Sequence, residues 1–218
     1  MDYVDFLILE NEQNQEIAYH SIAASLLHLY VGAGDTLTNT MRWMCVILSL
    51  HPEVQEKCYA ELNACYEANQ KYAEKKCPYV QATLEETFRF RPVGDSLPHM
   101  VSADLTIDGT KVKKGTVIQA SLTAIMHNPL YFKDPEKFNP DRFISSGKFV
   151  RDPKVCVFST GLRNCVGKKL AQMEFFSFAA HLLHKLKLIH VKGDLTPVKH
   201  NSLLKPGNFQ VQFISRSQ

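Results

Sequence analysis

The chain has 218 residues, of which 45% are hydrophobic and 22% are charged. This balance is typical of a chain that folds around a core, so it excludes wholesale disorder, and ten glycines and ten prolines without a fixed period exclude a collagen-like chain. The formal charge is +3, with no Lys/Arg run and no basic stripe interleaved with aromatic residues. The composition therefore indicates no nucleic-acid partner.

The N-terminus and the apolar stretches carry no export or membrane signal. Asp2 and Asp5 make the start acidic, whereas a secretory signal begins with basic residues. The two most apolar stretches are 22–31 and 43–50. Each is shorter than the roughly 18 apolar residues that a spanning helix needs. We predict no transmembrane segment and no export signal in this chain.

The cysteines are spread along the chain. They stand at positions 45, 58, 65, 77, 156 and 165. No CxxC pair is present, so the spacing indicates neither a compact disulfide framework nor a zinc site of the usual kind. We predict reduced thiols in a reducing compartment.

The first half of the sequence is helical in pattern. Apolar residues recur in steps of three and four from Ile22 onward and predict one long helix, which ends near Leu50. Pro52 suits the first turn of a second helix, over about 52–69. A third helix is predicted from Pro78 to just before Pro92, because the residue before a proline disfavours the helical conformation.

The pattern changes after Pro98. Alternating residues around Asp108-Gly109 predict a β-hairpin, since this dipeptide suits a two-residue turn. A strand is expected over 116–120, and a short helix over 121–127.

The meander segment, defined here as residues 128–154, shows little regular structure. Four prolines interrupt it, while Phe132, Phe138 and Phe143 are spaced to pack it down. A structureless loop of this length inside a compact domain is usually functional. A final helix is predicted from about Cys165 to Leu186, followed by a tail of short strands.

Cys165 stands at the predicted start of the final helix, in a turn with glycines on both sides. A helix N-terminus carries unsatisfied N–H donors and a partial positive charge, which together with Arg163 favour a thiolate. Gly161 and Gly167 leave room for a flat, bulky group to approach the backbone. The alternative is that Cys165 is a small buried hydrophobic residue.

Gly32 and Gly34 lie in the middle of the long predicted helix. Each costs roughly 1 kcal/mol in a helix interior, so they indicate a close neighbour, a kink or a helix end. Thr36 can donate to a carbonyl one turn earlier, and an acid beside a hydroxyl, Asp35 and Thr36, suits proton delivery. The alternative is a helix boundary at which Asp35 is the N-cap.

Two further motifs carry charge. Glu86 and Arg89 share a helix face at spacing i, i+3, where such a pair is usually exposed and contributes less than about 1 kcal/mol. Arg142 stands in Pro140-Asp141-Arg142-Phe143, and an arginine between aromatic residues and a proline is typical of a buried anchoring side chain.

Taken in order, these motifs resemble the C-terminal half of a cytochrome P-450, a haem-thiolate monooxygenase. The family's cysteine loop, Phe-x-x-Gly-x-Arg-x-Cys-x-Gly, is matched by Phe158, Gly161, Arg163, Cys165 and Gly167. Its Glu-x-x-Arg and Pro-acid-Arg-Phe motifs are matched at 86–89 and 140–143. The resemblance covers nearly the whole chain and is greatest to microsomal, drug-metabolising animal members.

The resemblance implies a set of haem-binding residues. Cys165 would be the axial thiolate ligand of the iron in haem b (iron protoporphyrin IX), where a thiolate favours O–O cleavage. Arg163 and His99 would pair with the haem propionates. Phe158 would pack beside the thiolate and the ring, at the turn that contains Gly161.

The resemblance also assigns roles outside the cysteine loop. Asp35 and Thr36 would lie over the oxygen-binding face and manage protons, although Ala33 and Leu37 replace a glycine and a hydroxyl residue that the family usually has there. Substrate contacts would come from near Gly32, from 93–97 and from 202–206. The side chains of Glu86, Arg89 and Arg142 would form a buried charge network, which reverses the surface interpretation of that pair.

The implied fold is mainly α (α+β), with a long central helix, small β-hairpins, a meander and a cysteine loop. Residues 1–218 would form one truncated domain without the N-terminal anchor and roof helices of the family. Much of the apolar surface from Ile22 to Leu48 would then face water. At roughly 25 cal/mol per Å², that loss is large against a usual stability of about 5–15 kcal/mol, so we expect marginal stability and weak haem binding.

The implied function is a monooxygenase that uses O2 and an NADPH-dependent reductase to oxidise a small lipophilic substrate at the cytoplasmic face of the endoplasmic reticulum membrane. Three alternatives remain: a non-catalytic haem-binding fragment, a haem-free interaction module, and a haem-thiolate isomerase that needs no reductase. The Asp35-Thr36 pair disfavours the isomerase, because that pair serves O2 activation.

Overall fold

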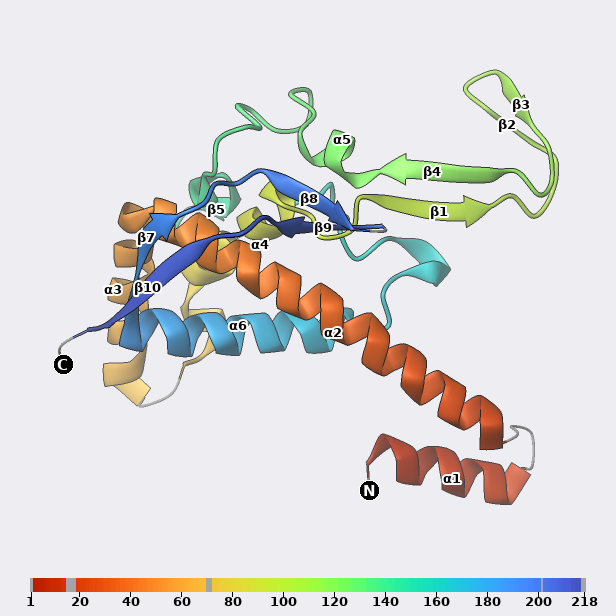
Figure 1. Ribbon diagram of the computed structural model, residues 1–218, viewed down its shortest axis with the longest axis horizontal. Helices are drawn as coiled ribbons and strands as arrows, with labels where there is room; N and C mark the ends of the chain where they lie inside the picture. Colours follow the sequence, from red (N-terminus) through yellow and green to blue (C-terminus); the bar gives the residue numbers. More distant parts are fainter. Residues whose placement is uncertain (1, 15–18, 70–71, 201, 217–218) are drawn as a thin grey trace.

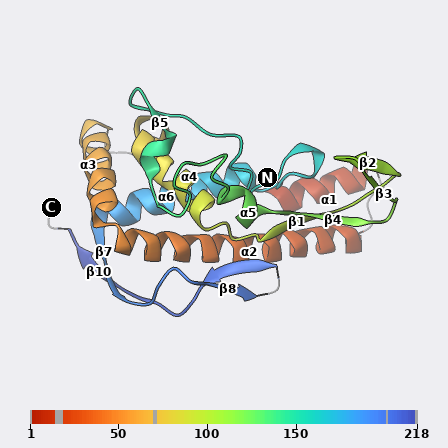
Figure 2. The same ribbon diagram turned by 90° about the horizontal axis from the view of Figure 1, so that it is seen from above.

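The computed structural model describes residues 2–14, 19–69, 72–200 and 202–216. Its α-helices are α1 (Tyr3–Asn14), α2 (Tyr19–Leu50), α3 (Pro52–Asn69), α4 (Pro78–Phe90), α5 (Leu122–Met126) and α6 (Lys168–Lys185). The long helix α2 crosses the whole molecule, and α6 lies beside its C-terminal part (Figure 1). Figure 2 shows α3 across the C-terminal end of α2, and α1 alongside its N-terminal end. The predicted helices over the first half are confirmed, whereas α1 was not predicted.

The main core lies where the C-terminal half of α2 meets α3, α4 and α6. Trp43 and Leu48 of α2 are fully buried there, together with Leu62 of α3, Val80 of α4 and Leu183 of α6. The indole N–H of Trp43 also donates to the carbonyl oxygen of Leu204 at 3.0 Å. This single helix half therefore anchors both the helical layer and the C-terminal strands.

The N-terminal half of α2 is exposed. Leu27, Tyr30 and Val31 present 61%, 79% and 60% of their surface. The expectation that apolar surface between Ile22 and Leu48 faces water is correct for this half and wrong for the buried half. Among the described residues no helix combines the length and apolar character needed to cross a membrane.

Strands of the described residues pair two by two, all antiparallel. The pairs are β1 (Ser96–Met100) with β4 (Val117–Ser121), β2 (Leu105–Ile107) with β3 (Thr110–Val112), β5 (Ile144–Ser145) with β6 (Lys148–Phe149), β7 (Leu186–Lys192) with β10 (Gln210–Ser215), and β8 (Pro197–His200) with β9 (Leu203–Pro206). The first two pairs form an arm that projects from the rest of the molecule at the upper right of Figure 1.

The predicted hairpin turn is confirmed. Asp108 and Gly109 join β2 to β3 with φ of 46° and 79°, and two successive positive φ values define a turn that matches strand twist. The predicted strand over 116–120 is β4, and the predicted short helix is α5. Ser121 caps α5 by accepting from the backbone N–H of Ala124 at 3.2 Å.

The meander segment has little regular structure, as predicted. It contains a 3-10 turn, η2 (Pro140–Phe143), and the short pair β5–β6. Phe132, Phe138 and Phe143 are buried, so they do pack it against the helices.

The start of α6 differs from the prediction. The helix begins at Lys168, three residues after Cys165, with Gly167 as its N-cap. The backbone N–H of Cys165 instead donates to the carbonyl oxygen of Phe158 at 2.8 Å, and Asn164 is extended. Residues 164–167 therefore belong to the loop rather than to the helix.

Candidate functional site

The cysteine loop, defined here as residues 158–167, presents its sulfur to solvent. Cys165 is an exposed thiol, so the buried alternative is wrong. Gly161 has a φ of 71°, in the region that favours glycine, and a Cβ built there would meet no atom within 4 Å. The short turn η3 (Gly161–Arg163) therefore leaves the backbone beside the sulfur open to a flat group.

Apolar side chains around the sulfur are also exposed. Leu162 is fully exposed, and Val166, Leu170 and Met173 each present more than half of their surface. Exposed apolar area of this kind marks a surface that takes an apolar ligand or partner. Exposed apolar side chains on the loop and on the first turns of α6, together with an exposed thiol, are the chemistry that a large, flat, apolar group such as a porphyrin requires.

Burial separates Cys165 from other thiols. Burial raises the pKa of Cys45 to about 11 and the pKa of Cys58 to about 12. Both thiols are therefore protonated at neutral pH in the chain without ligands, and both are buried away from any surface on which a large ligand could bind. Among the described residues no group of three or more His, Cys, Asp or Glu side chains could hold a bare metal ion. A single exposed cysteine suits an iron whose other ligands come from a porphyrin.

The other predicted haem-binding residues lie in different elements. Phe158 is half-buried, and its ring packs edge-on against Phe88 of α4 at 5.4 Å, which joins the loop to the core. Arg163 in η3 and His99 in β1 are both exposed. The side chains of Arg163 and His99 are therefore both open to solvent, on two separate elements.

The predicted acid and hydroxyl lie within a continuous helix. Asp35 is an exposed residue of α2, and the helix boundary with Asp35 as N-cap is wrong. The Thr36 hydroxyl donates to the carbonyl oxygen of Gly32 at 2.8 Å, as predicted. A Cβ built at Gly32 or Gly34 would meet nothing within 4 Å. These glycines therefore leave a bare strip of helix on the same turns that carry Asp35 and Thr36.

The Glu86–Arg89 pair is fully buried, so its interpretation as a surface pair is wrong. Arg89 contacts the carboxylate through Nε and Nη2, at 2.7 and 2.9 Å. Arg142 adds an ion pair from Nε at 3.1 Å, and the backbone N–H of Asn139 donates to the same carboxylate at 2.8 Å. The structure thus forms the three-residue network that the resemblance implied. A buried charge is tolerated when it is paired and hydrogen-bonded in this way.

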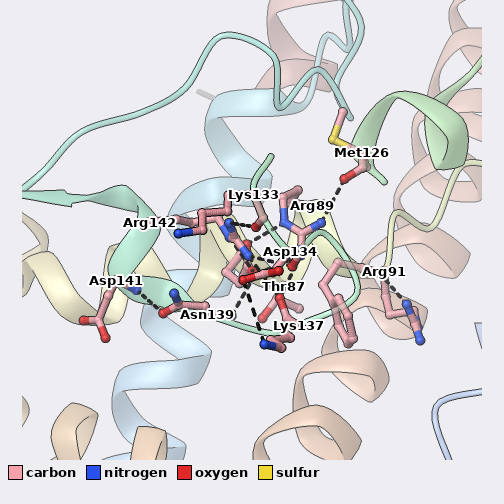
Figure 3. Close-up of polar contacts among 12 residues, drawn as sticks. Thr87, Arg89, Arg91, Met126, Lys133, Asp134, Lys137, Asn139, Asp141 and Arg142 are labelled. Carbon is pink, nitrogen blue, oxygen red and sulfur yellow. Dashed lines mark hydrogen bonds and ion pairs between the residues drawn. The ribbon is translucent and has the colours of Figure 1, made fainter. Parts of the chain in front are cut away.

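This network also holds the meander. Figure 3 shows Arg89 and Arg142 converging, with bonds to surrounding carbonyl groups. Arg142 donates to the carbonyl oxygens of Lys133 and Lys137 at 2.9 and 3.1 Å, and Arg89 donates to that of Met126 at 2.8 Å. Glu86 therefore fixes the position of a long segment that has little secondary structure of its own.

A second acid beside this network was missed. Glu85 is buried, and burial raises its pKa to about 7, although Arg151 opposes the shift. The only sequence signal was the doubled acid Glu85-Glu86 within an amphipathic helix.

Comparison with known proteins shows the family to which the chain belongs. A model of the cytochrome P450 family matches residues 1–213. The chain is 33% identical over 224 residues to cytochrome P450 2C16 of Oryctolagus cuniculus, covering 98% of this chain and 46% of that protein. It is 32% identical over 193 residues to human cytochrome P450 2J2, covering 84% of this chain and 38% of that protein. Thus the chain belongs to the cytochrome P450 family, whose members bind haem b.

Solved structures confirm the fold. A zebrafish cytochrome P450 structure with progesterone superposes with a TM-score of 0.89 at 28% identity, covering 99% of this chain and 51% of that one. A second zebrafish structure, with abiraterone, gives a TM-score of 0.87 at 27% identity, covering 100% and 53%. The predicted mainly α (α+β) fold is confirmed. The chain spans about half the length of these proteins.

Proposed function

We propose that this chain is the haem-thiolate portion of a monooxygenase, in which Cys165 supplies the iron ligand. Members of the family catalyse such oxidations. The observation that carries the proposal is the exposed thiol of Cys165 in a glycine-flanked turn, in a loop that carries exposed apolar side chains and leads into a helix that carries more. The bound haem would supply O2 activation, with a thiolate that favours O–O cleavage.

The remaining residues would bind and orient the haem. Arg163 and His99 would pair with its propionates, and their exposure on separate elements supports this. Phe158 would pack beside the sulfur from the core side, and Gly161 would let the ring approach the backbone. Each of these roles requires a side chain or backbone that faces the open surface of the cysteine loop.

Asp35 and Thr36 would hold and move protons on the opposite face of the haem. The Thr36 hydroxyl uses its own hydrogen for the carbonyl oxygen of Gly32, which leaves its oxygen free to accept a hydrogen bond from a ligand. The exposed carboxylate of Asp35 on the same turn would exchange protons with water.

The wider context follows from the relatives. Residues 1–218 would form part of one domain, working with an NADPH-dependent reductase at the endoplasmic reticulum membrane. The substrate would be a small lipophilic molecule, contacted from the α2 turn at Gly32 and from the segments 93–97 and 202–206. The progesterone in the zebrafish relative supports a lipophilic class.

The experiment is hemin titration of the purified chain, followed by reduction and addition of CO. We expect the strongly red-shifted Soret band of thiolate ligation, which Cys165→Ser abolishes. Cys156→Ser, in the half-buried neighbouring thiol, is the matched control and keeps the band. A spectrum of nitrogen ligation, or an unchanged Cys165→Ser spectrum, would contradict the proposal. Substrate oxidation with a reductase then separates a monooxygenase from a haem binder without activity.

A further inference from the structure

Glu85 lies next to Glu86 in α4 but is held very differently. Its carboxylate oxygen Oε1 lies 3.4 Å from Nε of Arg151, and the two side chains are 5% and 42% exposed. By contrast, Glu86 has two arginines and a backbone N–H. Glu85 is therefore a buried acid with one partner that can move toward solvent. A small pocket of about 20 Å³, room for one water, lies beside the pair.

Arg151 connects this acid to the two segments that flank the cysteine loop. It stands in the segment between β6 and the loop, where its guanidinium also lies over the Phe149 ring at 5.8 Å. On the other side of the loop, Gln172 belongs to the first turns of α6. In the orientation that satisfies both of its polar atoms, its amide oxygen accepts from Nη1 and Nη2 of Arg151 at 3.1 and 3.0 Å.

The end of the meander segment, which precedes the cysteine loop, and the helix α6, which follows it, therefore meet at the guanidinium of Arg151, and Glu85 joins that guanidinium to α4. We propose that Glu85 is a positioning residue for Cys165, acting through a strut composed of Glu85, Arg151 and Gln172. All three residues of the strut belong to this chain, and their contacts form in its structure without a bound haem. It differs from the Glu86 network, which holds the meander and makes no contact with Arg151 in the described hydrogen bonds and ion pairs.

The strut changes with pH because its acid titrates near neutrality. Burial raises the pKa of Glu85 to about 7, Arg151 and Lys168 of α6 lower it, and Asp152 raises it. Glu74 also lines the adjoining pocket. Below this pKa the neutral carboxyl loses its charge attraction for Arg151, and the half-exposed guanidinium is free to turn to solvent. Above it, the ionised carboxylate holds Arg151 and Gln172 together.

The test compares Glu85→Gln with the unmodified chain by hydrogen exchange of the Cys165 amide, which is bonded to the Phe158 carbonyl. Taking the ratio of the two rates at each pH cancels the intrinsic pH dependence of exchange. We expect a ratio near one at about pH 6 and roughly threefold faster exchange in the variant at about pH 8, the size expected of a partly exposed ion pair. Over the same range the variant gains thermal stability, since it no longer buries a charge.

In Glu85→Gln the exchange of the Cys165 amide should become faster while thermal stability increases. A merely structural role for Glu85 would instead make exchange faster and lower the stability together. Arg151→Gln should loosen the loop as much as Glu85→Gln, and the double variant should add nothing further. Glu61→Gln is the matched control, because burial also raises the pKa of Glu61, yet this carboxylate accepts from the N–H groups of Tyr79 and Val80. A rate ratio of one at every pH, or an equal change in Glu61→Gln, would overturn the proposal.

Discussion

The buried charge network around Glu86 of α4 and the cysteine loop differ in how many of their side chains have partners within the protein. Around Glu86 every oxygen of the carboxylate has a charged or N–H partner, and the side chains of Glu86 and Arg89 are fully buried. In the cysteine loop the sulfur of Cys165 and the side chain of Leu162 face solvent. The difference shows that the charges of the Glu86 network are satisfied by residues of this chain, whereas the exposed apolar side chains of the cysteine loop form a surface that suits a ligand or partner.

The largest effect is expected from breaking the core network. Glu86→Ala leaves two buried arginines without their acid, which should reduce the free energy of unfolding by about 3–5 kcal/mol. Urea unfolding followed by circular dichroism measures it. Asp141→Asn is the control, because its ion pair with Lys57 is exposed and should matter by less than about 1 kcal/mol. Equal losses in the two variants would contradict the comparison.

Next in size is a pH effect that comes from Glu85. Its pKa in the folded chain is about 7, against an ordinary 4.5, so the folded chain binds more protons between these values. The contribution of Glu85 to the free energy of unfolding is therefore fully present below about pH 4.5. About 3 kcal/mol of this contribution is lost as the pH rises through about 7. Urea midpoints measured across this range should fall in the unmodified chain and fall less in Glu85→Gln. Parallel curves would show that Glu85 is not the group responsible.

The smallest effect on stability is expected in the cysteine loop itself. Leu162→Ala removes a fully exposed side chain, so the free energy of unfolding should change by less than about 0.5 kcal/mol. Hemin affinity should nevertheless fall, because the apolar face around Cys165 becomes smaller. Parallel measurements of the urea midpoint and of hemin binding check both statements. A large stability loss would mean that the loop belongs to the core.

The sequence predicted the elements whose signals are local. Periodicity located α2, α3 and α4, and Asp108-Gly109 located the β2–β3 turn, because these patterns depend on neighbours a few residues apart. The N-terminal limit of α6 was wrong by three residues, since the bond from Cys165 to the Phe158 carbonyl extends the loop. The helix α1 was missed altogether.

The residues that surround the buried charges of α4 come from distant positions in the sequence. The motif Glu86–Arg89 alone was typical of a surface pair, and only its third member, Arg142, 56 positions from Glu86, makes its burial possible. Likewise, the sequence near Glu85 gave no indication that this acid contacts Arg151 or that Arg151 contacts Gln172. The family resemblance anticipated the first network because it brought in the family's known arrangement, whereas the second was visible only in the folded chain.

By itself, the sequence determined the family, the cysteine in its glycine-flanked turn and the order of the helices, because motif spacing and periodicity are properties of the linear chain. Only the tertiary structure decided which charges are buried and which half of α2 is exposed. The physical reason is that burial depends on segments brought together from distant positions, and the free energy of a charged side chain changes far more with those surroundings than with its neighbours in sequence.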